Sequence, residues 1–365
     1  TGTVTGPLAA ALSGAVTVNN GAGTNVAATL LSTIAAGTGG GVTVSAAVNI
    51  TGDTSEVIAA LDTAGVLATT ANIVLSDTPN VGDLQTLNGK TSGSIKISNG
   101  AITYSGSATV LAAALAGTVT DGSGNPLSGA MTLTGNPNAT QLQTINNATT
   151  GNVIIPNAGI TLSGTPAVLV EALAGSVATS GSAKISGTVT ITTSDPDSAQ
   201  LKTINDAIDG TIVVPDKTVQ LSGTATALAA ALTGTVTNSS NEKINGTVTI
   251  TGANPTEAEL KTINDAIDGA IDIPSKLVAL SSTADVLAAA LAGTVREVTS
   301  GDKITGNVTI TDTPTEVELQ TINNGTTASI QIPAANQAFT ASASVLAEAL
   351  TCLLYTSPSP RDGDE

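Results

Sequence analysis

The chain has 365 residues, of which 28 are acidic and 11 basic, so its formal charge is −17 at neutral pH. An acidic chain without a basic stripe repels phosphate, so we expect neither nucleic acid nor an anionic membrane surface as a partner. The sequence contains no His and a single Cys, which excludes Ser-His and Cys-His catalytic arrangements and zinc sites built from His and Cys. We therefore predict that the chain is not an enzyme.

Residues 1–72 resemble irregular copies of the repeat that follows. Helix-like apolar segments end near Leu12 and Leu61, and residues 30–34 resemble the start of more regular helical segments farther along. Because the terminal repeats of an array are often atypical, we predict the same architecture here with insertions and deletions. No apolar run approaches the ~20 residues that a membrane-spanning helix needs, so we predict no membrane insertion.

Residues 73–351 form a regular tandem repeat with a period of 58 or 59 residues. Its first marker is the segment Leu-Lys-Thr-Ile-Asn-Asp-Ala-Ile-Asp-Gly at 260–269. The leading Leu of this marker recurs as Leu84, Leu142, Leu201, Leu260 and Leu319. The second marker, Ala-Leu-x-Gly-x-Val, lies between copies of the first, and its Leu recurs as Leu115, Leu173, Leu232 and Leu291. A period of this length predicts a repeat array.

Both markers predict short helices. In the first, Leu260, Ile263 and Ile267 recur at helical spacing and lie on one face. Thr256 and Glu259 have the spacing of a capping box at the start of that helix. The glycines predicted to end the first helix in the left-handed conformation are Gly93, Gly151, Gly210 and Gly269. The residues that the second helix is predicted to bury are Val286, Leu287, Ala290 and Leu291.

Short segments that alternate polar and apolar residues separate the helices and predict strands. Corresponding segments begin at Val219, Val248 and Val278, which are 29 and 30 residues apart. Each repeat is therefore predicted to contain two coils of about 29 residues, each a strand, a turn, a strand and a helix. We predict an α/β repeat solenoid in which the coils stack and corresponding strands form parallel β ladders. The alternative is a string of small α+β repeat domains, which would be marginally stable at about 60 residues each.

Residues 352–365 break the repeat. The array predicts a Gly after Thr351, but the sequence continues as Cys-Leu-Leu-Tyr-Thr-Ser-Pro-Ser-Pro-Arg-Asp from Cys352 onward. This segment resembles a translated sequencing adapter at the end of an assembled environmental reading frame. We therefore predict a non-native or disordered tail that is not part of the fold, and we expect the chain to be a fragment of a longer protein.

Two pairs of Asp side chains at the end of the first helix are candidate calcium ligands. Asp206 with Asp209, and Asp265 with Asp268, lie where the helix dipole disfavours negative charge. A hard cation with oxygen ligands, such as Ca²⁺, would relieve that repulsion. The alternative, which we favour, is a solvated Asp-Gly turn. Residues 121–125 alternate oxygen-bearing side chains as a calcium loop does, but the distal Glu is missing, so a polar turn is favoured there too.

One polar column recurs more regularly than any other in the array. It consists of Asn88, Asn146, Asn205, Asn264 and Asn323. A row of amides could bind a ligand, but each Asn directly follows an apolar residue on the buried face of the first helix. We therefore predict a structural ladder in which the amides bond turn backbone, as Asn does in leucine-rich repeats.

Thr residues at alternate strand positions suggest a hydroxyl-rich face that could bind ice. Such segments lie at 188–192, 247–251 and 307–311. The intervening coils present Gln220 and Ser222, or Ala279 and Ser281, at the corresponding places. In the predicted ladder the Thr rows would recur only at every second strand, which favours an ordinary solvated face.

The repeat resembles a known class of sequence. Its succession of Gly-Thr-Val-Thr-Ile-Thr, Ala-Glu-Leu-Lys-Thr-Ile-Asn-Asp-Ala and Ala-Ala-Ala-Leu-x-Gly-Thr-Val is similar to Thr/Ala-rich tandem repeats in very large surface and secreted proteins of marine cyanobacteria. The resemblance covers residues 73–351 and implies an extracellular or cell-surface location. We therefore predict a non-catalytic structural or adhesive region without a cofactor, which meets an unknown surface ligand or self-associates. The alternative is a binding module for ice or carbohydrate that uses the Thr-rich strand face.

Overall fold

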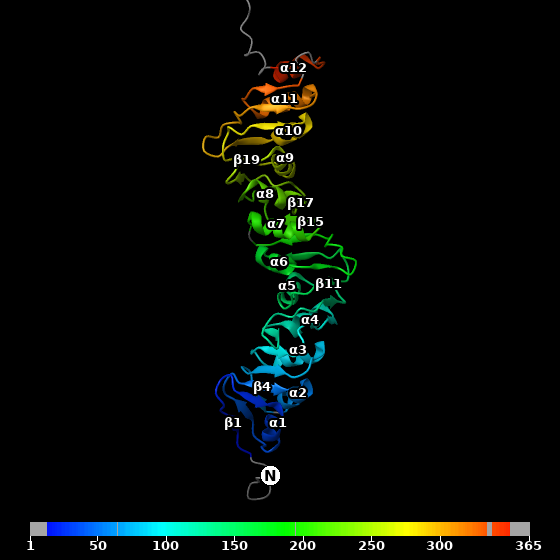
Figure 1. Ribbon diagram of the computed structural model, residues 1–365, viewed down its shortest axis with the longest axis vertical. Coiled ribbons are helices and arrows are strands. Elements are labelled where there is room, and N and C mark those ends of the chain that lie inside the picture. The colour runs from blue at the N-terminus through cyan, green and yellow to red at the C-terminus, as the bar shows by residue number, and fades with distance from the viewer. Residues whose placement is uncertain (1–12, 64, 194, 334–337, 351–365) are drawn as a thin grey trace, which may run out of the picture. The chain divides into compact units, whose positions relative to one another are not determined.

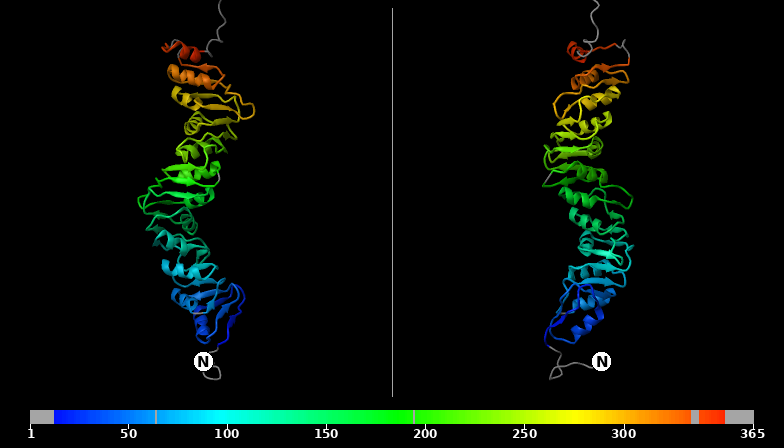
Figure 2. Two further views of the ribbon diagram at one scale, coloured as in Figure 1. Left: turned by 180° about the vertical axis from the view of Figure 1, so that it is seen from behind. Right: turned by 60° about the vertical axis from the view of Figure 1, so that its left-hand side comes forward.

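The computed structural model describes residues 13–63, 65–193, 195–333 and 338–350. The chain divides into two compact units. The first contains Thr1–Leu162 with Val168–Ile185, and the second contains Ser163–Ala167 with Ser186–Glu365. Each unit is a succession of short strands and helices (Figure 1 and Figure 2). The tail at 352–365, with Cys352, lies outside the described residues, so its predicted character stays a prediction.

The first unit runs through the following elements. Its helices are α1 Ala28–Ala36, α2 Thr54–Asp62, α3 Val81–Lys90, α4 Ala108–Leu115, α5 Ala139–Asn147 and α6 Pro166–Leu173. Its strands are β1 Val16–Val18, β2 Asn25–Ala27, β3 Val42–Val44, β4 Asn49–Gly52, β5 Val66–Leu67, β6 Asn72–Leu75, β7 Ile95–Ile97, β8 Tyr104–Gly106, β9 Val119–Asp121, β10 Met131–Leu133, β11 Val153–Ile155, β12 Leu162–Gly164 and β13 Val177–Thr179. The boundary between the units passes through β12 and α6.

The second unit continues the same alternation. Its helices are α7 Ser198–Ala207, α8 Ala225–Leu232, α9 Glu257–Ala266, α10 Ala284–Leu291, α11 Glu316–Gly325 and α12 Ala343–Leu350. Its strands are β14 Val189–Ile191, β15 Thr211–Val214, β16 Leu221–Gly223, β17 Thr235–Asn238, β18 Val248–Ile250, β19 Ala270–Ile273, β20 Leu280–Ser282, β21 Thr294–Glu297, β22 Val308–Ile310 and β23 Ile330–Gln331.

The order of the elements along the chain confirms the predicted coil. In the second unit β17, β18 and α9 form one strand–strand–helix coil, and β19, β20 and α10 form the next. These strands pair in parallel in small sheets, and no sheet among the described residues closes into a barrel. The predicted α/β repeat solenoid is therefore confirmed.

The register of the ladder differs from the prediction. We expected the strands that precede successive helices to stack without interruption, but one sheet has the order β16, β18, β19, β21. β18 and β19 flank α9 in the chain and pair directly, so α9 is the crossover of a parallel βαβ unit. The next sheet begins again with β20 beside β22. In the regular repeats the crossover therefore inserts a post-helix strand into the sheet and ends the ladder within one repeat. Near the N-terminus the expected stacking does occur, because β2, β4 and β6, which precede α1, α2 and α3, are consecutive neighbours in one sheet.

The core lies between each sheet and its helices. Val248, Ile271 and Val295 stand in register across the sheet β16-β18-β19-β21, and all three are buried. Leu260 and Ile263 of α9 are fully buried, as predicted. Burial of these aliphatic side chains stabilises the fold by about 1.5–3 kcal/mol each, and a single coil could not bury them on its own.

The helix starts follow the predicted capping chemistry. The Thr256 hydroxyl accepts a hydrogen bond from the Glu259 N–H at 3.3 Å, and the Glu259 carboxylate accepts one from the Thr256 N–H at 2.9 Å. The same box forms between Thr315 and Glu318 in the next repeat.

In the second-marker helix α10, the prediction that Val286 is buried was wrong, because that side chain is only half-buried.

The glycines predicted to end the first-marker helices neither end them nor adopt the left-handed conformation, so this prediction was wrong. Each helix ends three or four residues earlier, for example α9 at Ala266. None of Gly93, Gly151, Gly210 and Gly269 has a positive φ. Instead, each lies against the backbone of the preceding coil. A Cβ on Gly269 would lie 2.1 Å from the Gly246 carbonyl oxygen, and one on Gly210 would lie 2.0 Å from that of Gly187. Glycine is required at these positions because the stacked backbones leave no room for a side chain.

Candidate functional site

The Asn column ties neighbouring helices together. Asn264 is in the last turn of α9, and its Nδ2 donates a hydrogen bond to the Ala289 carbonyl of α10 at 2.7 Å. Asn205 makes the same bond to Ala230 of α8 at 2.8 Å. The equivalent bonds elsewhere run from Asn88 to Ala113, from Asn146 to Glu171 and from Asn323 to Glu348. Asn88 and Asn146 also donate to the Ala116 and Ala174 carbonyls, in the turns that follow α4 and α6. The amides therefore bond the backbone of the following coil, which leaves them poorly placed to bind a ligand.

A glycine makes room for Asn205 and for Asn264 in the second unit. A Cβ on Gly293 would lie 2.4 Å from Asn264 Oδ1, and one on Gly234 would lie 2.3 Å from Asn205 Oδ1. These glycines belong to the Ala-Leu-x-Gly-x-Val marker, so the two markers of the repeat meet at this contact. The column was predicted to bond turn backbone, and Asn88 and Asn146 do so, but all five amides also bond a helix carbonyl that the sequence does not indicate.

The Asp pairs are exposed and pair with lysine where the structure shows a partner. The Lys261 Nζ lies 2.5 Å from Asp265 Oδ2 one helical turn away, and Lys202 bonds Asp206 in the same way. These lysines place a positive charge near the helix C-termini, where the dipole favours it. Across the described residues no group of three or more His, Cys, Asp or Glu side chains could hold a metal ion. Calcium binding at Asp206, Asp209, Asp265 and Asp268 stays a prediction.

The turn at 121–125 satisfies its own oxygen atoms. The Asp121 carboxylate accepts hydrogen bonds from the Asn125 N–H at 2.8 Å and the Ser123 N–H at 2.9 Å. The Asn125 bond is the main reason that the pKa of Asp121 lies below its usual value. The side chain therefore folds back on its own turn, as Asp commonly does between strands.

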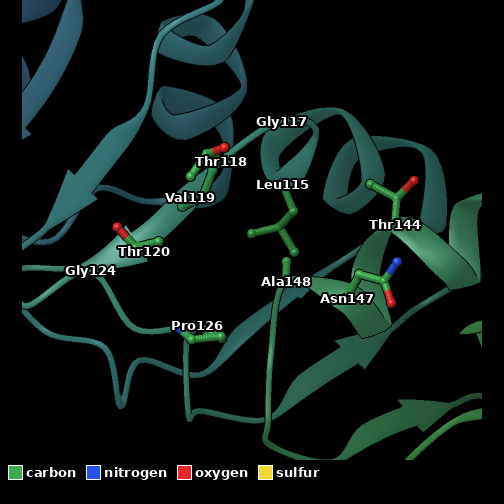
Figure 3. Close-up of a pocket in the computed structure, with 10 residues that line it drawn as sticks. All are labelled: Leu115, Gly117, Thr118, Val119, Thr120, Gly124, Pro126, Thr144, Asn147 and Ala148. Atoms are coloured by element: carbon green, nitrogen blue, oxygen red, sulfur yellow. The ribbon is translucent and has the colours of Figure 1, made fainter.

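A shallow recess opens between neighbouring coils of the first unit. It has a volume of about 400 Å³ beside the C-terminal ends of α4 and α5. Figure 3 shows Leu115 pointing toward Ala148 inside it, with Thr144 and Asn147 at one side. Its lining contains no titratable side chain. Acid–base or nucleophilic chemistry would need such groups within reach of a substrate.

The second unit repeats this recess. Leu232, Thr262 and Ala266 line a hollow of about 330 Å³ there, and they occupy the repeat positions of Leu115, Thr144 and Ala148. Asp265 also lines it, as a single carboxylate that pairs with Lys261. The feature therefore arises from the repeat itself: it forms where a second-marker helix ends beside the next first-marker helix. It provides small polar contacts without a converging set of reactive groups.

The outward strand faces carry the remaining candidate residues. On the sheet β16-β18-β19-β21, Ser222, Thr249 and Asp272 stand in one row, and Arg296 Nε lies 2.8 Å from Asp272 Oδ1. On the following sheet, Thr309 stands between Ser281 and Gln331. The Thr-rich strands β14, β18 and β22 thus belong to three separate sheets, and they do not form one continuous array.

Comparison with known proteins adds no family to this description. No protein-family model matches the chain, and no curated protein is significantly similar to it. In the described part of the chain, no helix is long and apolar enough to cross a membrane.

Proposed function

We propose that this chain is a non-catalytic structural or adhesive repeat region of a secreted or cell-surface protein. The observation that carries the proposal is how the recurring polar groups are used. The Asn column bonds helix carbonyls, the Thr and Glu pairs cap helices, and the Asp121 carboxylate closes its own turn. Groups that repeat in this way maintain a scaffold, whereas an active site is built once.

Composition supports an extracellular location for such a scaffold. The chain before Cys352 contains no cysteine, so its folding does not depend on disulfide formation during export. Its net charge of −17 keeps copies of the chain apart and soluble. An adhesive role would use the exposed surfaces of many coils at once, where weak contacts add through multivalency.

A force experiment tests the structural part of the proposal. The full chain, tethered at both ends, is expected to unfold under load in successive steps, because each coil contacts only its neighbours. A single all-or-none rupture would contradict it. In parallel, the chain is screened against chromogenic glycosides, esters and phosphate esters, and saturable turnover of any of them would contradict the non-catalytic role.

A further inference from the structure

One sheet places the Thr-rich segment at 188–192 beside further Thr-bearing strands, a pairing that the sequence pattern did not indicate. In the second unit β14, β15 and β17 are adjacent parallel strands (Figure 1). Thr211 of β15 pairs with Thr235 of β17, and Thr188 precedes Val189 of β14 as Thr211 precedes Ile212, its partner. Three Thr residues therefore lie side by side across three strands.

A second row runs parallel to the first, two residues farther along each strand. Thr190 of β14 pairs with Val213 of β15, which in turn pairs with Thr237 of β17. The alternating residues Val189, Ile212 and Val236 are buried against the helices, so both rows face the other side of the sheet. Thr237 is 8% exposed and its hydroxyl is enclosed, so the accessible part of this row ends at Val213.

The hydroxyls of the accessible rows are not used by the protein. Thr188, Thr190 and Thr211 are half-buried and Thr235 is exposed. None of these four hydroxyls has a hydrogen-bond partner among the described residues. Many other Thr hydroxyls in the array are engaged, for example that of Thr203, which bonds the Ala199 carbonyl in α7 at 3.0 Å. The face therefore offers free hydroxyls together with methyl groups, and both rows lack charged residues.

The neighbouring sheets do not share this surface. In the next repeat the same two rows contain Ala270 and Thr294, and then Asp272 and Arg296, where the last two form an ion pair. Charged side chains hold their own hydration shells and interrupt a regular hydroxyl grid. Both sheets contain the same βαβ crossover, which sets β14 beside β15 and β18 beside β19, so the difference lies in the residues that the strands carry.

We propose that the outward face of β14, β15 and β17 binds an ordered water lattice, that is, the surface of ice. Adjacent strands lie ~4.8 Å apart and alternate residues on one strand ~6.6 Å apart, so the Thr side chains form a two-dimensional grid. Faces of ice present water molecules in grids of comparable spacing. A carbohydrate ring would favour an aromatic platform, and these strands contain no aromatic residue. This site is additional to the structural role and does not depend on it.

Matched Lys substitutions in successive repeats test the site. Thr190→Lys and Thr235→Lys place a charge on the proposed face, and Thr249→Lys and Thr294→Lys place it at the same repeat positions one repeat later. The full chain and each variant are compared for inhibition of ice recrystallisation and for adsorption of labelled protein to an ice surface. Circular dichroism and thermal melting select the variants that fold.

We expect the unmodified chain to inhibit recrystallisation and adsorb to ice. Thr190→Lys and Thr235→Lys should raise the protein concentration needed to inhibit recrystallisation about tenfold, equivalent to ~1.4 kcal/mol. Thr249→Lys and Thr294→Lys should leave that concentration unchanged. A conservative variant, Thr211→Val, removes one hydroxyl without adding charge and should reduce adsorption in a folded protein. An inactive parent chain, or equal losses in both Lys pairs, would overturn the proposal. Saturable binding to a glycan in place of ice would overturn it as well.

Discussion

At the scale of single residues, glycine and asparagine make the contacts that fix how neighbouring coils stack. Gly269 allows its backbone to pack directly against the backbone at Gly246. Asn264 donates a hydrogen bond from α9 to the Ala289 carbonyl of the next helix, α10. Both act between coils and neither acts within its own helix. Substitutions at such positions should therefore affect stability strongly, although the residues bury little apolar surface.

Replacing Gly269 with Ala should destabilise the second unit. The added Cβ would lie 2.1 Å from the Gly246 carbonyl oxygen, so one backbone must move. We expect a loss of about 2–3 kcal/mol in the free energy of unfolding, at the upper end for an overpacked site. Urea titration measures it. The control is Gly135→Ala, because a Cβ there meets nothing within 4 Å. Equal midpoints for both variants would contradict the backbone contact.

Replacing Asn264 with Ala should remove a bond between coils and leave the Ala289 carbonyl with one partner fewer. Because Asn264 is 9% exposed, we expect a loss of about 1–2 kcal/mol in unfolding free energy. Asn254→Ala is the matched control, since Asn254 is exposed and lies outside the helices. If Asn264 instead bound a ligand, its replacement would leave the stability of the isolated chain near that of the control.

At the scale of elements, helix α9 contributes both to its own local stability and to the pairing of the strands on either side of it. It caps itself through Thr256 and Glu259, buries Leu260 and Ile263, and serves as the crossover between β18 and β19. The cap and the buried face could be predicted because both follow from spacing along one helix. The strand pairing could not, because the strands before and after a helix look equally suitable as partners of the preceding strand.

The same limit explains the errors at the candidate site. A Gly that follows a helix can adopt a left-handed conformation or make room for another backbone. Only the approach of Gly246 shows that the second applies at Gly269. The segment that contains Thr190 was recognised, but its alignment with the strand that contains Thr211 was not, because the expected ladder kept these strands apart. Local chemistry was readable in this sequence, whereas contacts between coils required the structure.

Truncating Leu260 should damage the array locally. The side chain is fully buried, so Leu260→Ala should lower the unfolding free energy of the coils that it contacts by about 2–5 kcal/mol. Because solenoid coils contact only their neighbours, hydrogen exchange should accelerate in α8, α9 and α10 and less in more distant coils. Val317→Ala, at a site 64% exposed on α11, is the control and should change little. Uniform acceleration throughout the second unit would contradict a near-neighbour solenoid.

The turn between β9 and β10 should respond to acid. Hydrogen bonds from its own backbone, chiefly from Asn125, hold the pKa of Asp121 in the folded state below its ordinary value. The stabilisation is therefore present above the unfolded-state pKa and is lost as pH falls through the folded-state value. NMR titration should show this depressed pKa, and Asp121→Asn should flatten the pH dependence of amide exchange in residues 122–125. An Asp121 carboxyl that titrates at or above its ordinary value would contradict the turn geometry.

At the scale of the whole molecule, charge and repetition act together. The net charge of −17 comes from carboxylates that are unevenly distributed along the chain, and several of them pair with a lysine on the same or the neighbouring coil. Each such pair contributes little to stability on its own, because exposed ion pairs are screened by solvent and salt. Together they limit repulsion between neighbouring carboxylates while the surface stays acidic.

This arrangement gives the calcium hypothesis a decisive test. If Asp206, Asp209, Asp265 and Asp268 held Ca²⁺, millimolar calcium would stabilise the folded chain by mass action, and Asp265→Asn with Asp268→Asn would reduce the gain. We expect instead that calcium raises the melting temperature no more than magnesium at equal ionic strength, because the Asp265 carboxylate already bonds Lys261. Differential scanning calorimetry with calcium, magnesium and a chelator measures the effect. A calcium-specific rise that the double Asn variant abolishes would refute the expectation and establish the site, whereas a similar rise in that variant would assign the effect to general screening of an acidic surface.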